Sequence, residues 1–244
     1  MYSTYIFDLY GTLVDIHTDE SKKILWEKLA LFYGFYGASY TAGELQTAYE
    51  ALTADTSDIN EKVLQNAHEA HPEIQIEHIF AKLFTQKGVS PSEELSVHAG
   101  QFFRILSTDY VRLYDGASAL LADLKSAGKK VFLLSNAQRI FTACELHALG
   151  IDHYFDDIFI SSDFGIKKPD PGFFNQLIEK HRIAKDTAVM IGNDGRCDIL
   201  GARSAGIASV YIHSNLSPDE PLPPADYILA SMDMSALHQI LLLK

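Results

Sequence analysis

Four short stretches of the chain carry side chains that can attack, bind an anion or neutralise charge, and each follows an apolar run. Asp8 ends the first run, at residues 2–7, and Gly11 lets the backbone turn tightly around a bound group. A carboxylate in this position is a candidate nucleophile. A single aspartate after a strand more often caps a turn, so the other three stretches decide between the two interpretations.

Hydroxyl, amide and amino groups follow the next two runs. Ser135 and Asn136 end the run at residues 130–135, where they and the N–H groups of a following helix can hold an anion. Alone, this pair is typical of a helix N-cap. Lys168 stands directly before a rigid Pro-Asp-Pro turn at residues 169–171. A lysine fixed beside two prolines is better placed to neutralise charge than one on an open surface.

The fourth stretch contributes oxygen atoms. Asn193, Asp194 and Asp198 follow the run at residues 188–192, and together with Asp8 they form the oxygen-only environment that suits Mg²⁺. Helix capping does not explain all four stretches together. We therefore predict one site in which Asp8 attacks, Lys168 and helix N-termini neutralise charge, and a metal assists.

The elements that must position these residues alternate between strand and helix. From about residue 113 onward, near-continuous apolar runs alternate with helical patterns, which indicates a parallel sheet covered on both faces. Ligands bind at the carboxyl ends of the strands in such sheets. We predict a doubly wound α/β fold with strands at 2–7, 130–135, 157–161, 188–192, 209–213 and 227–230, and with helices at 116–127, 139–149, 172–181, 196–205 and 232–243.

A different pattern occupies residues 15–107. Apolar residues recur there at helical spacing, as in Leu25, Leu29 and Phe32, and glycine and proline divide the stretch into four or five helices. No strand pattern is visible. We predict a core domain formed by residues 1–14 and 108–244, with residues 15–107 inserted as a helical cap domain.

Composition limits the partners. The 244 residues include 47% hydrophobic and 21% charged side chains, which is typical of a globular protein. A formal net charge of −12 opposes non-specific binding to nucleic acid or to an anionic membrane surface. Cys144 and Cys197 fit free thiols in a reducing compartment, and no signal or membrane-spanning run is present. We expect a cytoplasmic protein that acts on a small, anionic molecule.

The four motifs, in this order, resemble those of the haloacid dehalogenase (HAD) superfamily, whose aspartate-nucleophile hydrolases have a Rossmann-like core and, in one type, an inserted four-helix (C1-type) cap. The resemblance covers essentially the whole chain. It implies that Asp8 forms the covalent intermediate, Ser135 binds the transferred group and Lys168 neutralises charge. It also implies substrate contacts from Tyr10, Thr12 and Asn136, and Mg²⁺ ligands from Asp8, the Tyr10 carbonyl, Asn193, Asp194 and Asp198.

Two residues depart from the phosphatase pattern of the superfamily. Tyr10 stands where most of these phosphatases have an aspartate that acts as general acid and base. Because a phenol has a pKa near ~10, it is a poor proton donor at neutral pH. Asn193 stands where a metal-binding aspartate is usual, so we expect weaker metal binding. Slow turnover and a preference for good leaving groups, such as acyl or aryl phosphates, follow.

Both departures are also features of the dehalogenase branch, which needs neither a general acid nor a metal. That branch binds the substrate carboxylate through a cap arginine, but no arginine precedes Arg104 here. Phe174 stands where those enzymes have a tyrosine. The leading hypothesis is a Mg²⁺-assisted phosphatase that acts on a small phosphorylated metabolite through a phospho-aspartyl intermediate. The alternatives are a metal-independent 2-haloacid dehalogenase and an inactive binding protein with the same fold.

Overall fold

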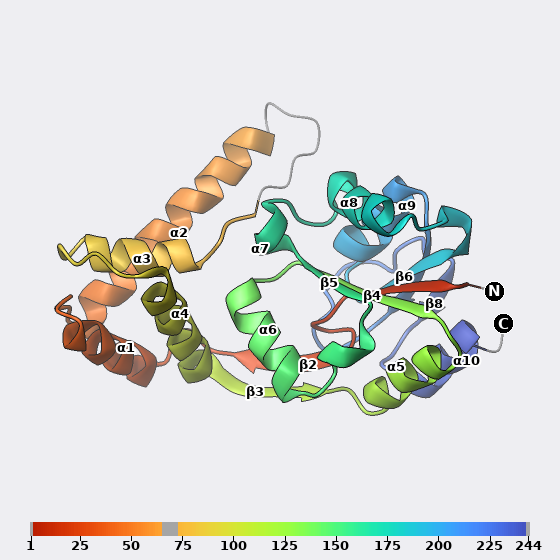
Figure 1. Cartoon of the computed structure of the whole chain (residues 1–244), viewed down its shortest axis with the longest axis horizontal. Coiled ribbons are helices and arrows are strands. Elements are labelled where there is room, and N and C mark those ends of the chain that lie inside the picture. Colours follow the sequence, from red (N-terminus) through yellow and green to blue (C-terminus); the bar gives the residue numbers. More distant parts are fainter. Residues whose placement is uncertain (1, 65–72, 243–244) are drawn as a thin grey trace.

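A six-stranded parallel sheet forms the centre of the core, which lies to the right of the helices α1–α4 in Figure 1. The computed structural model describes residues 2–64 and 73–242. The strand order is β5–β4–β1–β6–β7–β8, so the first strand of the chain lies inside the sheet. All six predicted strands are present, and their ends differ from the predicted ones by at most two residues: β1 (Thr4–Phe7), β4 (Lys130–Ser135), β5 (Asp157–Ile160), β6 (Ala188–Gly192), β7 (Ala208–Ile212) and β8 (Tyr227–Leu229).

Helices cover both faces of this sheet, which confirms the doubly wound α/β fold. Side chains alternate along β1, so Tyr5 and Phe7 join one apolar cluster while Ile6 joins another. The first cluster includes α5 (Ala117–Ser126) and α10 (Met234–Leu242). The second includes α8 (Pro171–His181) and α9 (Gly201–Ala205). The other helical segments of the core are α6 (Arg139–Ala148), α7 (Ser161–Phe164), η1 (Asp152–Tyr154), η2 (Lys185–Thr187) and the π-helical η3 (Gly195–Leu200).

A helical insertion leaves the sheet after the first strand and packs around its own apolar cluster. Its helices in the described residues are α1 (Lys23–Phe35), α2 (Ala42–Leu64), α3 (Glu77–Thr85) and α4 (Glu93–Ser107). Ile140 and Phe141 of α6 complete that cluster, and a Cβ at Gly100 of α4 would lie 2.5 Å from Ile140 Cδ1. The insertion therefore contacts the core closely along α6. No described helix is both long and apolar enough to cross a membrane.

A two-stranded antiparallel ribbon joins this insertion to the core. It pairs β2 (Val14–Thr18) with β3 (Thr108–Leu113). The expectation that residues 15–107 contain no strand was therefore wrong. Both strands are short and half-exposed with polar residues interspersed, and their pairing partners lie far apart in the chain, so a local apolar pattern does not show them. The proposed boundary of the cap at residues 15–107 stays a prediction, and the helices themselves begin at α1.

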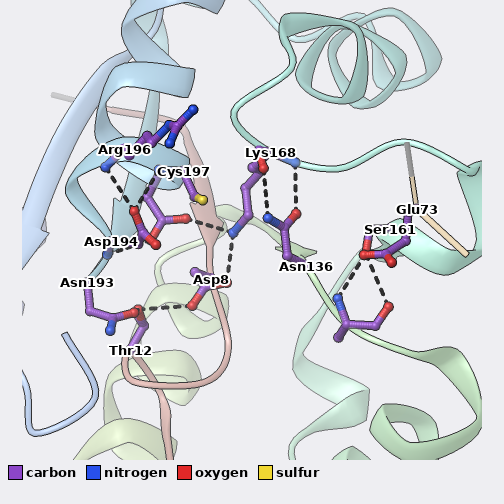
Figure 2. Close-up of polar contacts among 12 residues, drawn as sticks. Asp8, Thr12, Glu73, Asn136, Ser161, Lys168, Asn193, Asp194, Arg196 and Cys197 are labelled. Atoms are coloured by element: carbon purple, nitrogen blue, oxygen red, sulfur yellow. Dashed lines mark hydrogen bonds and ion pairs between the residues drawn. The ribbon is translucent and has the colours of Figure 1, made fainter. Parts of the chain in front are cut away.

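The segment before α3, residues 73–76, makes a second contact between the insertion and the core. The Gln138 side chain accepts a hydrogen bond from the Ile76 N–H at 2.9 Å and donates one to the Ile74 carbonyl at 3.0 Å. The Glu73 carboxylate accepts a hydrogen bond from Ser161 at 3.0 Å (Figure 2). This segment holds the insertion next to the loop that follows β4.

Candidate active site

The polar ends of β1, β4 and β6 surround a cavity of about 170 Å³. Every residue that lines it belongs to the core, and no described residue of the helical insertion does. The lining residues are Asp8, Tyr10, Ser135, Asn136, Lys168, Asn193, Asp194, Cys197, Asp198, Leu216 and Pro218. Most of the residues that the sequence predicted for the site therefore line one cavity, and Thr12 contacts two of them (Figure 2).

Lys168 links two carboxylates at the bottom of the site. Its Nζ donates hydrogen bonds to Asp8 Oδ1 and Asp198 Oδ1, both at 2.7 Å. The lysine is only 2% exposed. Burial opposes its charge, but Asp198 and Asp8 outweigh burial and hold the pKa of Lys168 above its ordinary value. Lys168 therefore stays protonated at neutral pH and is placed to neutralise charge beside Asp8.

Ser135 and Asn136 have different surroundings. The Ser135 hydroxyl is buried and has no hydrogen-bond partner within the described structure. A buried hydroxyl without a hydrogen-bond partner destabilises the fold by about 1–3 kcal/mol. A ligand that accepts its hydrogen bond would remove this cost and would therefore bind more tightly. The Asn136 amide instead donates to the Lys168 carbonyl and accepts from the Lys168 N–H, both at 2.8 Å (Figure 2). Asn136 thus positions the lysine backbone.

Thr12 connects the loop after β1 to the loop after β6. Its hydroxyl lies 3.4 Å from Asp8 Oδ2 and 3.3 Å from Asn193 Oδ1 (Figure 2). Gly11, which directly precedes Thr12, has a φ of +85°. A Cβ atom at this position would lie 2.2 Å from Asn193 Nδ2. Only glycine fits this conformation and this contact. The tight turn predicted at Gly11 therefore brings the nucleophile candidate and Asn193 to the same hydroxyl.

The candidate metal ligands offer oxygen atoms, which suits Mg²⁺ and not a soft metal ion. Asp8 and Asp198 are both hydrogen-bonded to Lys168. Asn193 and Asp8 both accept a hydrogen bond from the Thr12 hydroxyl. Asp194 lines the same cavity, but its Oδ1 accepts the N–H groups of Arg196 at 2.8 Å and Cys197 at 2.7 Å. Within the described residues, no three acidic, histidine or cysteine side chains form a metal-binding group. A Mg²⁺ site therefore needs the side-chain carbonyl oxygen of Asn193 and the backbone carbonyl oxygen of Tyr10 in addition to the carboxylates. These ligands stay a prediction.

The phenol of Tyr10 is hydrogen-bonded to α6. It donates to Glu145 Oε2 at 2.5 Å and lies 3.0 Å from the Thr142 hydroxyl. Glu145 also receives Arg104 Nε of α4 at 2.7 Å. Burial, reinforced by the Glu145 charge, raises the pKa of Tyr10 far above its ordinary value. The proton of Tyr10 is therefore held by Glu145 and is not available to a leaving group.

Six residues of this arrangement were not assigned to the site from the sequence: Arg104, Thr142, Glu145, Cys197, Leu216 and Pro218. Four of them carry a positional signal. Thr142 and Glu145 are three positions apart in a predicted helix, so they share the face that meets Tyr10. Leu216 and Pro218 follow a predicted strand, and the rule that ligands bind at the carboxyl ends of strands also applies to them. The signal in both cases is position within an element, because neither pair has a distinctive residue type.

The match to known families agrees with this geometry. A model of the haloacid dehalogenase-like hydrolases matches residues 2–206. The chain belongs to this family. A phosphoglycolate phosphatase of Vibrio cholerae is 27% identical over 97% of this chain and 95% of its own. A phosphoserine phosphatase of Thermus thermophilus is 31% identical over 59% of this chain, but the match spans only 57% of that enzyme.

Solved structures show the same fold. The HAD hydrolase YfnB of Bacillus subtilis, bound to magnesium, matches with a TM-score of 0.57 and 21% identity over 98% of both chains. A 2-haloacid dehalogenase of Pseudomonas syringae matches with a TM-score of 0.58 and 20% identity, over 98% of this chain and 96% of its own. A HAD phosphatase of Thermococcus onnurineus matches with a TM-score of 0.59 and 20% identity, over 98% of this chain and 97% of its own. The fold alone therefore does not separate a phosphatase from a dehalogenase, and the site must decide.

Proposed function

We propose that the protein is a Mg²⁺-assisted phosphatase that acts on a small phosphorylated metabolite. The observation that carries this proposal is the arrangement of Asp8, Lys168 and Ser135 around one cavity. A carboxylate, a charged amine and an unpartnered hydroxyl are the groups that a phosphoryl group needs for attack and for charge neutralisation. Relatives that are named phosphatases support the same choice.

The hydrogen bonds of Asp8 favour one of its two oxygen atoms as the attacking atom in this proposal. Asp8 Oδ1 is held by Lys168, whereas the hydrogen bond from Thr12 to Asp8 Oδ2 is long, at 3.4 Å. In this proposal Oδ2 attacks phosphorus, the bond from phosphorus to the leaving oxygen breaks, and an aspartyl phosphate forms. Water then attacks the same phosphorus, which releases inorganic phosphate and restores the carboxylate.

The other residues bind and orient the transferred group. Lys168 neutralises charge on it, and the Ser135 hydroxyl donates a hydrogen bond to one of its oxygen atoms. Mg²⁺, held by Asp8, Asn193, Asp198 and the Tyr10 carbonyl, would supply further charge neutralisation. Because the Tyr10 hydroxyl keeps its proton and donates it in a hydrogen bond to Glu145, the leaving oxygen departs without help from the residue two positions after Asp8. Acyl and aryl phosphates are therefore the favoured substrates.

A 2-haloacid dehalogenase is the second candidate. It is favoured by the hydrogen bond that the Tyr10 hydroxyl donates to Glu145, because halide leaves without a general acid and does not need the Tyr10 proton. A substrate carboxylate would then need a cation, yet among the described residues Lys168 is the only cationic side chain that lines the cavity, and it is bound to Asp8 and Asp198. This favours the phosphatase. An inactive binding protein is the third candidate.

The test measures phosphate release from phenyl phosphate and acetyl phosphate, with Mg²⁺ and with EDTA, in the wild type and in Asp8→Asn. We expect release that needs Mg²⁺ and that is lost in the variant. Chloride release from 2-chloropropionate, unaffected by EDTA, would instead establish the dehalogenase. Neither product under any condition would overturn both enzyme hypotheses in favour of a binding protein.

A further inference from the structure

The loop after β7 contributes an aliphatic wall to the cavity. Leu216 and Pro218 line it, and they are the only aliphatic residues among the lining residues. The other lining side chains carry carboxylate, amide, amine, hydroxyl or thiol groups. A bound molecule thus meets polar groups where its phosphate binds and an apolar surface on the side of this loop.

The loop is folded on itself at this point. The Ser214 N–H donates to the Ser217 hydroxyl at 3.0 Å, and the Ser217 N–H donates to the Ser214 carbonyl at 3.1 Å. The Leu216 N–H lies 3.3 Å from the buried Ser214 hydroxyl. This reciprocal set of hydrogen bonds fixes the turn that presents Leu216.

The turn is also anchored to the ribbon of β2 and β3. Asn215 donates a hydrogen bond to Asp15 Oδ1 at 2.9 Å and accepts one from the Tyr114 hydroxyl at 2.6 Å. Asp15 is 4% exposed and forms an ion pair with Arg112 at 2.7 Å. Further along, a Cβ at Gly195 would lie 3.1 Å from Pro223, so the loop also packs against the loop after β6. The wall is therefore held in place from two sides.

The charged groups around the cavity oppose the binding of a substrate that carries a second anionic group next to the core residues. Lys168 is the only cationic side chain among the lining residues, and two carboxylates hold it. Arg104 is bound to Glu145 outside the lining. A substrate carboxylate placed against Leu216 and Pro218 would lose water without gaining a partner, which is unfavourable.

We propose that Leu216 and Pro218 determine the specificity of this site and select phosphate esters and acyl phosphates whose organic part, apart from the phosphate, is uncharged and apolar. The proposal rests on the phosphatase function proposed above. It excludes as preferred substrates the phosphorylated acids, such as 2-phosphoglycolate, whose carboxylate would face this wall. Apolar contact with the leaving group contributes to kcat/KM, whereas the phosphate contacts are common to all substrates.

The experiment compares kcat/KM for phenyl phosphate, acetyl phosphate and 2-phosphoglycolate in the wild type, Leu216→Ala and Leu222→Ala. Leu222 is the matched control because it lies in the same loop, is 57% exposed and does not line the cavity. We expect Leu216→Ala to lower kcat/KM for phenyl phosphate about 10-fold and for the smaller acetyl phosphate less than about 3-fold. Leu222→Ala should change neither value, and the wild type should prefer phenyl phosphate to 2-phosphoglycolate.

A second variant tests the charge argument. Leu216→Arg should raise kcat/KM for 2-phosphoglycolate relative to phenyl phosphate by about 10-fold, because a guanidinium pairs with a carboxylate. An equal loss of kcat/KM on all three substrates in Leu216→Ala would contradict the role of Leu216 and Pro218 in specificity, but not the phosphatase function. A wild type that prefers 2-phosphoglycolate would do the same. No phosphate release from any substrate by the wild type would overturn both proposals. Thermal unfolding of each variant shows whether a loss comes from misfolding.

Discussion

Tyr10 lines the cavity of the candidate site and also contacts the helix beside it. Its backbone lies in the loop after the nucleophile, but its phenol is bound to Glu145 and Thr142 of α6. Glu145 is bound in turn to Arg104 of the insertion. A residue that stands where related phosphatases have a proton donor therefore connects the nucleophile loop to the helices beside it. In the proposed phosphatase mechanism, this exchange removes proton donation to the leaving group.

Replacing Tyr10 tests that interpretation. We expect Tyr10→Asp to raise turnover of an alkyl phosphate relative to an aryl phosphate, because a carboxylic acid can protonate the poor alkoxide leaving group. General acid catalysis contributes roughly 10²–10⁴-fold, so the aryl-to-alkyl ratio of kcat should fall by at least about 10-fold. Tyr10→Asn is the matched control, since it loses the same hydrogen bonds without gaining an acid. Equal changes in the ratio for both variants would contradict a protonation effect.

The sequence predicted the residue types of the site better than their contacts. Asp8, Ser135 and Lys168 were identified because each follows a recognisable apolar run or a rigid turn, and strand ends converge in a parallel sheet. The direction of the Tyr10 phenol depends on α6, whose position relative to β1 is set by tertiary packing. Asp194 shows the same limit, because its Oδ1 binds backbone N–H groups of its own loop, a contact that a motif does not reveal.

At the scale of elements, the six sheet strands were predictable and the ribbon of β2 and β3 was not. The sheet strands are apolar along most of their length because helices cover both faces, so their pattern is strong. The ribbon is held by pairing between residues on either side of the insertion, such as Val14 with Leu113. The ribbon nevertheless matters for function, since Asp15 of β2 anchors the loop that carries Leu216.

Asp156 joins three elements and gives a stability prediction. Its carboxylate accepts hydrogen bonds from Lys125 of α5 and from Lys130 and the Val131 N–H of β4. Burial opposes its charge, but these hydrogen bonds outweigh burial and lower the pKa of Asp156 to about 2. A pKa below its unfolded value stabilises the fold at pH values above about 4, and this contribution disappears as the pH falls toward 2.

We expect Asp156→Asn to lower the free energy of unfolding by about 1–2 kcal/mol at pH 7, after allowance for solvent screening of the partly exposed lysines. The difference from the wild type should shrink between pH 4 and pH 2.5. Urea unfolding of both proteins at several pH values measures this difference in the free energy of unfolding. Asp186→Asn, at an exposed position, is the control and should change stability by less than about 0.5 kcal/mol. A difference that stays constant with pH would show that the ionised form of Asp156 is not what stabilises the fold.

At the scale of the molecule, two of the contacts between the helical insertion and the core in the described part of the chain differ in kind. One is the packing of Ile140 and Phe141 of α6 into the apolar cluster of the insertion. The other is the segment at residues 73–76, which is hydrogen-bonded to Gln138. Since no described residue of the insertion lines the cavity, contact between the insertion and a substrate requires a movement that brings the two closer. The polar contact at Gln138 is easier to break than the apolar packing on α6, so we expect the movement to begin there.

Hydrogen exchange measured by mass spectrometry tests this order. Gln138→Ala removes the acceptor of the Ile76 N–H and the donor to the Ile74 carbonyl. With about 1 kcal/mol lost for each hydrogen bond, exchange in residues 73–76 should become about 10-fold faster or more. Gln101→Ala is the matched control, because it removes a hydrogen bond to Ile140 at the other contact and should leave this segment unchanged. Faster exchange in α4 and α6 of Gln138→Ala, to the same degree as in residues 73–76, would mean that both contacts open together and that the insertion moves as one rigid unit.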